Sequence, residues 1–285
     1  MNKGKLQTAD DRPTLLTPGG SEGGPFARAA RQPQPTRPLW TSRGISSFWL
    51  KLAAIVAMTC DHVGLIFYPH LPLEARCVLI GVGGLTFPVM AFLLVEGYVH
   101  TSNLGRYALR LLAFALVSEV PFWLFLGHEG NVLFTLLASL GALWFVDRVE
   151  DPLLRTVGLG GCLAASLLCD WGVVGPALVL LFFTFRANRF GVALPMALPI
   201  VMGVSSTWGS FAGALGEGSW RNLPFLLYYA AGCTAAIPLL SLYNGTRGTH
   251  PMKWFFYAYY PAHIAVLGLA YVVMFGSMPS LMVGW

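Results

Sequence analysis

The sequence is poor in charged residues. Only 11% of its 285 residues are Asp, Glu, Lys or Arg, whereas 55% are hydrophobic. Soluble proteins carry about 25% charged residues, so this composition excludes an ordinary soluble domain. The formal charge of +5 lies near the N-terminus and in short loops, without the clustered cations and interleaved aromatics of a nucleic-acid-binding surface. We therefore expect no nucleic-acid partner.

Cysteine is also scarce, with five residues in the whole chain. They contain no Cys-x-x-Cys pair and no Cys/His spacing that is typical of a metal site. Most of them lie inside apolar stretches, where a cysteine packs as a small apolar side chain. The sequence therefore predicts neither a disulfide framework nor a bound metal.

Residues 1–45 differ from the rest of the chain. They hold seven of the 18 Lys and Arg residues and are rich in Pro and Gly. No apolar stretch of the signal-peptide kind precedes Ser46. We interpret 1–45 as a disordered cytoplasmic tail and 46–277 as a transmembrane domain.

Long apolar segments dominate the second region. A helix that crosses a bilayer needs about 20 mainly apolar residues. The sequence therefore predicts an all-α, polytopic bundle of about nine transmembrane helices, with eight or ten as alternatives. The expected spans are 46–69, 77–99, 106–127, 131–147, 153–169, 171–187, 190–209, 222–243 and 254–277.

The cations of the loops predict the orientation of this bundle. Cytoplasmic loops of membrane proteins are enriched in Lys and Arg. Loops on the side of the N-terminus carry Arg106, Arg110, Arg148, Arg155, Arg186, Arg189, Arg247 and Lys253. The opposite loops carry only Arg76 and Arg221. We therefore expect a cytoplasmic N-terminus, an outward C-terminus and an odd number of spans.

Three ionisable residues lie in the first expected span: Lys51, Asp61 and His62. Such groups are costly in lipid and usually face a cavity or a partner. Eleven helical steps separate Lys51 from His62, which is roughly 16 Å along the axis. Neutral imidazole can act as a general base, although a purely structural hydrogen bond between helices is the alternative. Asp61 does not share a helix face with His62, so another helix must orient His62.

A second group of charges lies where the second span meets the third. Glu96 and His100 are one helical turn apart, and Arg106 and Arg110 follow across a short loop. The arginines could bind phosphate from the cytoplasm, with Glu96 positioning them. A charge cluster that only locks the two helices together explains the same pattern.

Polar residues also occur in the outer halves of the spans. Glu119 precedes Pro121, which is expected to kink its helix. The carboxyl could line a cavity shared with His62 or form a structural hydrogen bond. Asn131 and Asp170 stand at helix starts. Each of them could cap its helix or belong to a polar site at the outer end of the bundle, and the sequence does not choose between these roles.

The C-terminal third adds a loop and a second intramembrane histidine. The loop 243–248 has turn-forming Asn and Gly residues, and with Arg247 and Lys253 it could bind phosphate or be a plain turn. His263 follows Pro261 in the last span. It could relay protons, contact substrate or pack between helices.

In the residues described above, the chain resembles the TraX family, membrane proteins linked to conjugative pilus production and pilin N-terminal acetylation. The resemblance covers about 48–270. The matching segments, in order, lie in 50–64, 87–97, 100–112, 118–122, 131–135, 243–248 and 256–263. The family is similar to a wider group of membrane acyltransferases whose first helix carries a basic residue and, after ten residues, a histidine. The family pattern also places an arginine near Gly84, which this chain lacks.

The resemblance implies an acetyltransferase of the bacterial cytoplasmic membrane. Acetyl-CoA would enter from the cytoplasm, and a pilin subunit would present its N-terminal amine from outside. The expected catalytic residues are His62, Asp61, Glu119 and His263. The expected acetyl-CoA-binding residues are Lys51, Arg106, Arg110, Arg247 and Lys253. The expected substrate-binding residues are Glu96, Asn131 and Asp170.

Two other classes of function remain open from the sequence. A non-enzymatic assembly factor or chaperone would hold pilin in the membrane without acetyl-CoA. A small-molecule transporter is the third class, although the sequence shows no inverted repeat of the kind found in many transporters.

Overall fold

A computed structural model describes residues 44–186, 191–202, 223–248 and 253–279. This part of the chain is helical, as the sequence predicts, and its only β-pairing is two isolated bridges. Nearly all of the expected tail 1–45 lies outside the described residues. Its last residue, Ile45, hydrogen-bonds to the backbone of Leu242 and Asn244 and is therefore attached to the helical part of the chain.

Helix α2 (Ser47–Ile66) corresponds to the first expected span. Its start lacks a side-chain cap, and the loop after α10 provides backbone acceptors instead. The N–H of Ser47 donates to the Thr246 carbonyl at 2.8 Å, and the Ser47 hydroxyl donates to the Arg247 carbonyl. The loop 243–248 therefore satisfies part of the exposed N-terminus of α2.

The second expected span is two helices, α3 (Leu73–Gly83) and α4 (Thr86–His100), separated by Gly84 and Leu85. Pro88 has no N–H to donate to the Gly84 carbonyl four residues earlier. The Cys233 thiol approaches that carbonyl at 3.5 Å instead. The interruption is therefore compensated by a neighbouring helix.

Glycines bring α3 against α10 (Leu223–Ser241). A Cβ at Gly232 would overlap the Gly81 carbonyl, and a Cβ at Gly84 would lie 2.8 Å from the Tyr229 carbonyl. Small residues allow helix backbones to approach closely in membrane proteins. The glycine run that departs from the family pattern thus forms a tight helix crossing.

The remaining expected spans also contain helices in the described part of the chain. These helices are α5 (Leu104–Phe125), α6 (Val132–Arg148), α7 (Pro152–Ser166), α8 (Val174–Phe185), Ala193–Met202 and α11 (Lys253–Phe275). Within the described residues, four helical stretches are long and apolar enough to cross a membrane: Ser47–Ile66, Leu73–His100, Leu104–Phe125 and Trp254–Phe275. The 12 residues of α8 extend about 18 Å, less than the bilayer core of about 30 Å. The count of nine spans stays a prediction.

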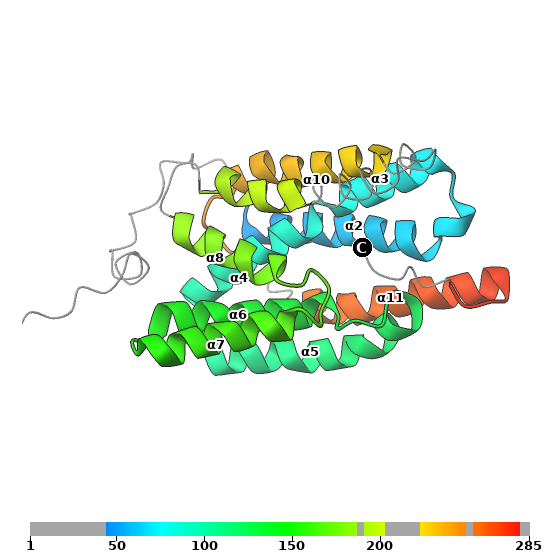
Figure 1. Cartoon of the computed structure of the whole chain (residues 1–285). Helices are drawn as coiled ribbons and strands as arrows, with labels where there is room; N and C mark the ends of the chain where they lie inside the picture. Colours follow the sequence, from blue (N-terminus) through cyan, green and yellow to red (C-terminus); the bar gives the residue numbers. More distant parts are fainter. Residues whose placement is uncertain (1–43, 187–190, 203–222, 249–252, 280–285) are drawn as a thin grey trace, which may run out of the picture.

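Helix α4 lies at the centre of the bundle, where it contacts α2, α6, α8 and α10. Helices α5, α6 and α7 form one side, and α2, α3 and α10 form the other (Figure 1). Helix α11 packs against both α5 and α2. This contact between the first and last helices brings together the two histidines singled out in the sequence.

Candidate functional site

A pair of buried histidines joins α2 to α11. His62 Nδ1 lies 2.6 Å from His263 Nε2, and the ring planes are within 8° of parallel. Each residue is 7% exposed. His263 is therefore the group from another helix that orients His62.

The surroundings of His263 determine which nitrogen carries the proton. Its Nδ1 lies 2.8 Å from the Tyr259 carbonyl, which can only accept a hydrogen bond. Nδ1 of a neutral His263 must therefore be protonated, and its Nε2 accepts the proton of His62 Nδ1. This arrangement leaves the lone pair of a neutral His62 on Nε2. Among the described residues, nothing hydrogen-bonds to that atom.

Tyr259 is held in place by a second contact between α2 and α11. Its hydroxyl lies 2.8 Å from the hydroxyl of Thr59, which also lies 2.8 Å from the Ile55 carbonyl. The ring of Tyr259 stacks on His263 at 5.0 Å. These contacts fix the orientation of His263 and, through it, that of His62.

Asp61 points away from the histidine pair, toward α3. Its carboxyl occupies the space that a Cβ at Gly83 would need. Asp170, in the loop between α7 and α8, is close enough to Asp61 for the two carboxyls to repel each other when both are ionised. The structure thus brings one expected catalytic residue together with one expected substrate-binding residue.

Burial raises the pKa of Asp170 to about 7, with a smaller contribution from the charge of Glu129. The backbone around Asp170 is well bonded. Its N–H donates to the Gly130 carbonyl at 2.7 Å, and its carbonyl accepts from the Thr135 hydroxyl. The loop before α6 therefore holds the Asp170 loop inside the bundle.

Glu119 and Asn131 lie together where α5 meets α6. Glu119 Oε2 accepts from the Asn131 side chain at 2.6 Å and from its backbone N–H at 3.1 Å. Asn131 also caps α6 by accepting from the Leu133 N–H at 3.0 Å. Both expected site residues thus have structural roles, and these bonds of Glu119 go to Asn131 rather than to the histidines.

On the opposite side of the bundle, Glu96 links α4 to the loop 243–248. The Tyr243 hydroxyl donates to Glu96 Oε2 at 3.1 Å, and His100 Nδ1 lies 3.8 Å from the same oxygen. Arg247 donates to the His100 carbonyl at 3.3 Å. Glu96 therefore positions this loop and its arginine, and in the part of the chain that the structure describes no hydrogen bond or ion pair joins it to Arg106 or Arg110.

The cations expected to bind acetyl-CoA are spread over this same end. Lys51 is half-buried, lies 5.5 Å from the centre of the Phe256 ring, and is close enough to Arg247 for their charges to repel. Arg110 has a buried Nε with no acceptor among the described residues, and its guanidinium reaches the Tyr257 hydroxyl. The side chain of Arg106 is exposed.

Lys253 starts α11, but its side chain lies outside the described part of the structure. In α2, an unbroken helix connects Lys51 with His62, so the axial separation expected from the sequence is kept. The cations that could attract a phosphate and the histidine that could accept a proton therefore stand at different depths.

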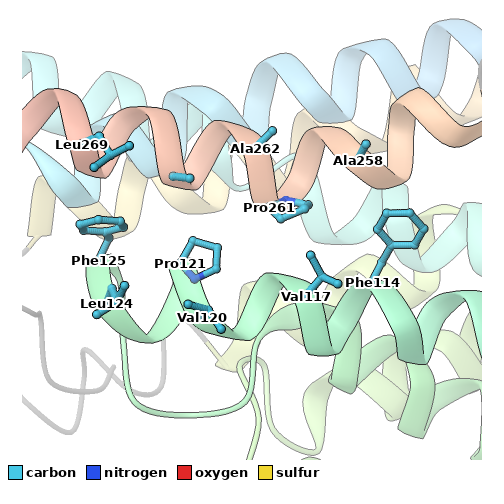
Figure 2. Close-up of a pocket in the computed structure, with 11 residues that line it drawn as sticks. Phe114, Val117, Val120, Pro121, Leu124, Phe125, Ala258, Pro261, Ala262 and Leu269 are labelled. Carbon is cyan, nitrogen blue, oxygen red and sulfur yellow. The ribbon is translucent and has the colours of Figure 1, made fainter.

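Helices α5 and α11 also enclose an open apolar groove of about 550 Å³. Pro121 and Pro261 face each other across it, with Phe114 and Phe125 along the α5 side (Figure 2). Its lining is apolar throughout, as expected for a surface in contact with lipid tails.

The sequence alone did not identify Tyr259 and Tyr260 as site residues. The available signal was the spacing of Tyr259 and His263, four residues apart, which places them on one face of a helix.

In the residues that the structure describes, no three His, Cys, Asp or Glu side chains are placed to hold a metal ion.

Most of the chain matches a known protein family. Residues 46–271 match the model of the TraX protein family. The chain belongs to the TraX family. A relative in Dichelobacter nodosus, named probable fimbrial assembly protein FimC of serogroup H1, is 32% identical over 240 residues. The match covers 78% of this TraX-family chain and 94% of the relative, and no solved structure shows a significant match.

Proposed function

We propose that this TraX-family protein is a membrane acetyltransferase with His62 as its general base. The observation that carries the proposal is the buried His62–His263 pair, whose bonding to the Tyr259 carbonyl leaves a basic lone pair on His62 Nε2. A histidine held in one tautomer by a second group is the usual arrangement of a general base that activates a nucleophile.

His62 would take a proton from the nitrogen of an acceptor amine as that nitrogen attacks. Bound acetyl-CoA supplies a thioester, whose C–S bond breaks as the new C–N bond forms. His62 would then return the proton to the leaving sulfur, so that the base is regenerated. His263 keeps its own proton on Nδ1 and acts as a positioning residue.

The cations at the other end fit the phosphates of the donor. Lys51 and Arg247 repel each other and form no ion pair with a carboxylate among the described residues. Arg110 has an orphaned buried Nε. An anion between α2, α5 and the loop 243–248 would relieve the repulsion and satisfy that donor. Arg106 and Lys253 would extend the same cationic surface toward the cytoplasm.

We further propose that the acceptor is a pilin or another membrane-presented chain with a free amine. The relative's name associates it with fimbrial assembly, and the family resemblance implies a pilin. A donor at the cationic end and an acceptor from the opposite end would account for a site buried between them. The corresponding location is the bacterial cytoplasmic membrane, with the N-terminus in the cytoplasm.

The second candidate function is a non-enzymatic pilin assembly factor, which the name of the Dichelobacter nodosus relative favours directly. Such a protein would bind pilin without acetyl-CoA. Its binding would not depend on His62 or Lys51.

The test is mass spectrometry of a pilin co-expressed with the wild-type protein, with His62→Ala and with His62→Gln. We expect the wild type to add the mass of one acetyl group to the pilin N-terminus, and both variants to lose this modification while still inserting in the membrane. Full acetylation by a well-folded His62→Gln variant would exclude His62 as the base. Pilin that is captured but unmodified by the wild type would favour the assembly factor.

A further inference from the structure

We propose that Asp61, Asp170 and Tyr260 form a binding site for a primary ammonium group beside His62. The three side chains come from α2, from the loop between α7 and α8, and from α11. The assignment as the acceptor site rests on the proposed acetyl transfer, whereas binding of an ammonium group does not.

Two carboxyls without a counter-ion are the first observation. Asp61 and Asp170 act on each other electrostatically. Across the described segments, no Lys, Arg or His forms an ion pair with either carboxyl. Both residues are half-buried, and like charges that are partly removed from water are costly unless a cation or a shared proton compensates them. A cationic ligand would supply that compensation.

The hydroxyl of Tyr260 is the second, independent observation. Tyr260 is 3% exposed, and its hydroxyl is buried without a hydrogen-bond partner among the described residues. The Val132 N–H is close but does not meet hydrogen-bond geometry. The carboxyls that act on this hydroxyl are Asp170, Glu119 and Asp61, in decreasing order. An unsatisfied buried hydroxyl destabilises the folded protein, so a ligand that forms a hydrogen bond with it is favoured.

The backbone that delivers Asp170 is strained. Trp171 has φ +67°, a left-handed conformation that is unfavourable for a non-glycine residue. Its ring stacks on Phe87 with centroids 4.1 Å apart, which holds this conformation. A glycine at position 83 leaves room for the Asp61 carboxyl. The fold thus places these two half-buried carboxyls between its helices at some cost to its own stability.

The chemistry of the three groups favours an ammonium ion. Two carboxylates and one hydroxyl oxygen offer three acceptors, and a primary ammonium has three N–H donors. The Tyr260 ring lies 6.1 Å from the ring of His62 and 5.8 Å from that of His263. The Tyr260 ring thus connects the ammonium site to the histidine pair. A bound ammonium would first give one proton to an ionised carboxylate of Asp61 or Asp170, and the resulting neutral amine would then be the nucleophile from which His62 takes the second proton.

Direct binding of small probes to the full-length protein in lipid nanodiscs, without acetyl-CoA, tests this site. The probes are octylammonium, octyltrimethylammonium, which has the charge but no N–H donor, and octanol, which is neutral. We expect saturable binding of octylammonium only. Asp170→Asn should weaken it about tenfold or more, as expected for loss of a buried charged partner. Tyr260→Phe should weaken it about fivefold, as expected for one hydrogen bond.

The matched control is Glu150→Gln, which removes an exposed carboxylate at the opposite end of the bundle and should leave binding unchanged. Equal binding of octyltrimethylammonium or octanol would overturn the proposal, as would unchanged binding by a folded Asp170→Asn variant. Selective octylammonium binding in a protein that transfers no acetyl group would refute only the proposed function. Acetyl transfer without this binding would refute only the site.

Discussion

His263 contributes to the site by keeping a proton on its Nδ1, so that its Nε2 accepts a hydrogen bond from His62. Because its Nδ1 faces the Tyr259 carbonyl at 2.8 Å, the proton stays on that nitrogen and the other nitrogen must accept. The sequence left three roles open for His263, and only the contact with His62 selects among them. That contact joins residues 201 positions apart, so neither helix alone could reveal it.

Replacing His263 should therefore impair the rate more than substrate binding. We expect His263→Ala to lower kcat by about 10²-fold or more, as for a disabled general base, while KM for acetyl-CoA changes little. His263→Gln can accept from His62 Nδ1 through its amide oxygen and should recover part of the rate. Steady-state kinetics of the purified variants measures both values. Equal rates for wild type and His263→Ala would rule out the positioning role.

The raised pKa of Asp170 leads to the prediction that the stability of the folded protein depends on pH. Its pKa in the folded protein is about 7, above the ordinary value of 3.8. Between these values the folded state keeps a proton that the unfolded state releases, so the unfolding temperature should fall as the pH rises from about 4 to 7. Thermal unfolding of ligand-free protein should show a smaller decrease in Asp170→Asn than in the control Glu150→Gln. An identical pH dependence in the two variants would contradict this origin.

The helices themselves were largely predictable from apolar length, but their junctions were not. Each of the nine expected segments contains a described helix. The break at Gly84 and Leu85 was missed because both residues are apolar or neutral and leave the hydropathy unchanged. The break lies where α10 packs closely against the chain, and the hydropathy of a segment does not indicate which helix packs against it. Asn131 was identified as a possible cap because capping depends on local sequence.

Because α3 and α10 cross closely, we expect alanine substitutions at two different glycines to have very different effects on the stability of the protein. Gly232→Ala should destabilise the protein by about 1–3 kcal/mol, as overpacking does, because its Cβ would overlap the Gly81 carbonyl. Gly160→Ala in α7 meets no atom within 4 Å and should be neutral or stabilising by about 0.5–1 kcal/mol. Thermal unfolding of the two variants in the same detergent provides the comparison. Equal midpoints would contradict the close crossing.

The distribution of charge over the whole bundle gives the two ends different chemistry. Lys51, Arg247 and Glu96 lie at the end formed by the start of α2 and the loop 243–248. Asp170 and Glu129 lie at the other end, near the junctions that precede α6 and α8. A cationic end and an acidic end suit an anionic donor and a cationic acceptor.

This asymmetry leads to a prediction of orientation. Glu150 and Glu129 are both exposed and lie at opposite ends. In intact cells, a membrane-impermeant maleimide should label Glu129→Cys, whereas Glu150→Cys should be labelled only after the membrane is permeabilised. The unmodified protein, with its five native cysteines, gives the background. Labelling of Glu150→Cys alone in intact cells would reverse the proposed topology.

The sequence by itself determined that this chain is a helical bundle for an apolar environment and that Lys51 and His62 stand at different depths. These features follow from composition and helical rise, which are local. Only the tertiary structure decided that His263 meets His62, that Asp61 lies within electrostatic range of Asp170, and that the Tyr260 hydroxyl finds no partner among the described residues. Each of these depends on which helices pack together, and packing is decided by shape and small residues along the whole length of a helix.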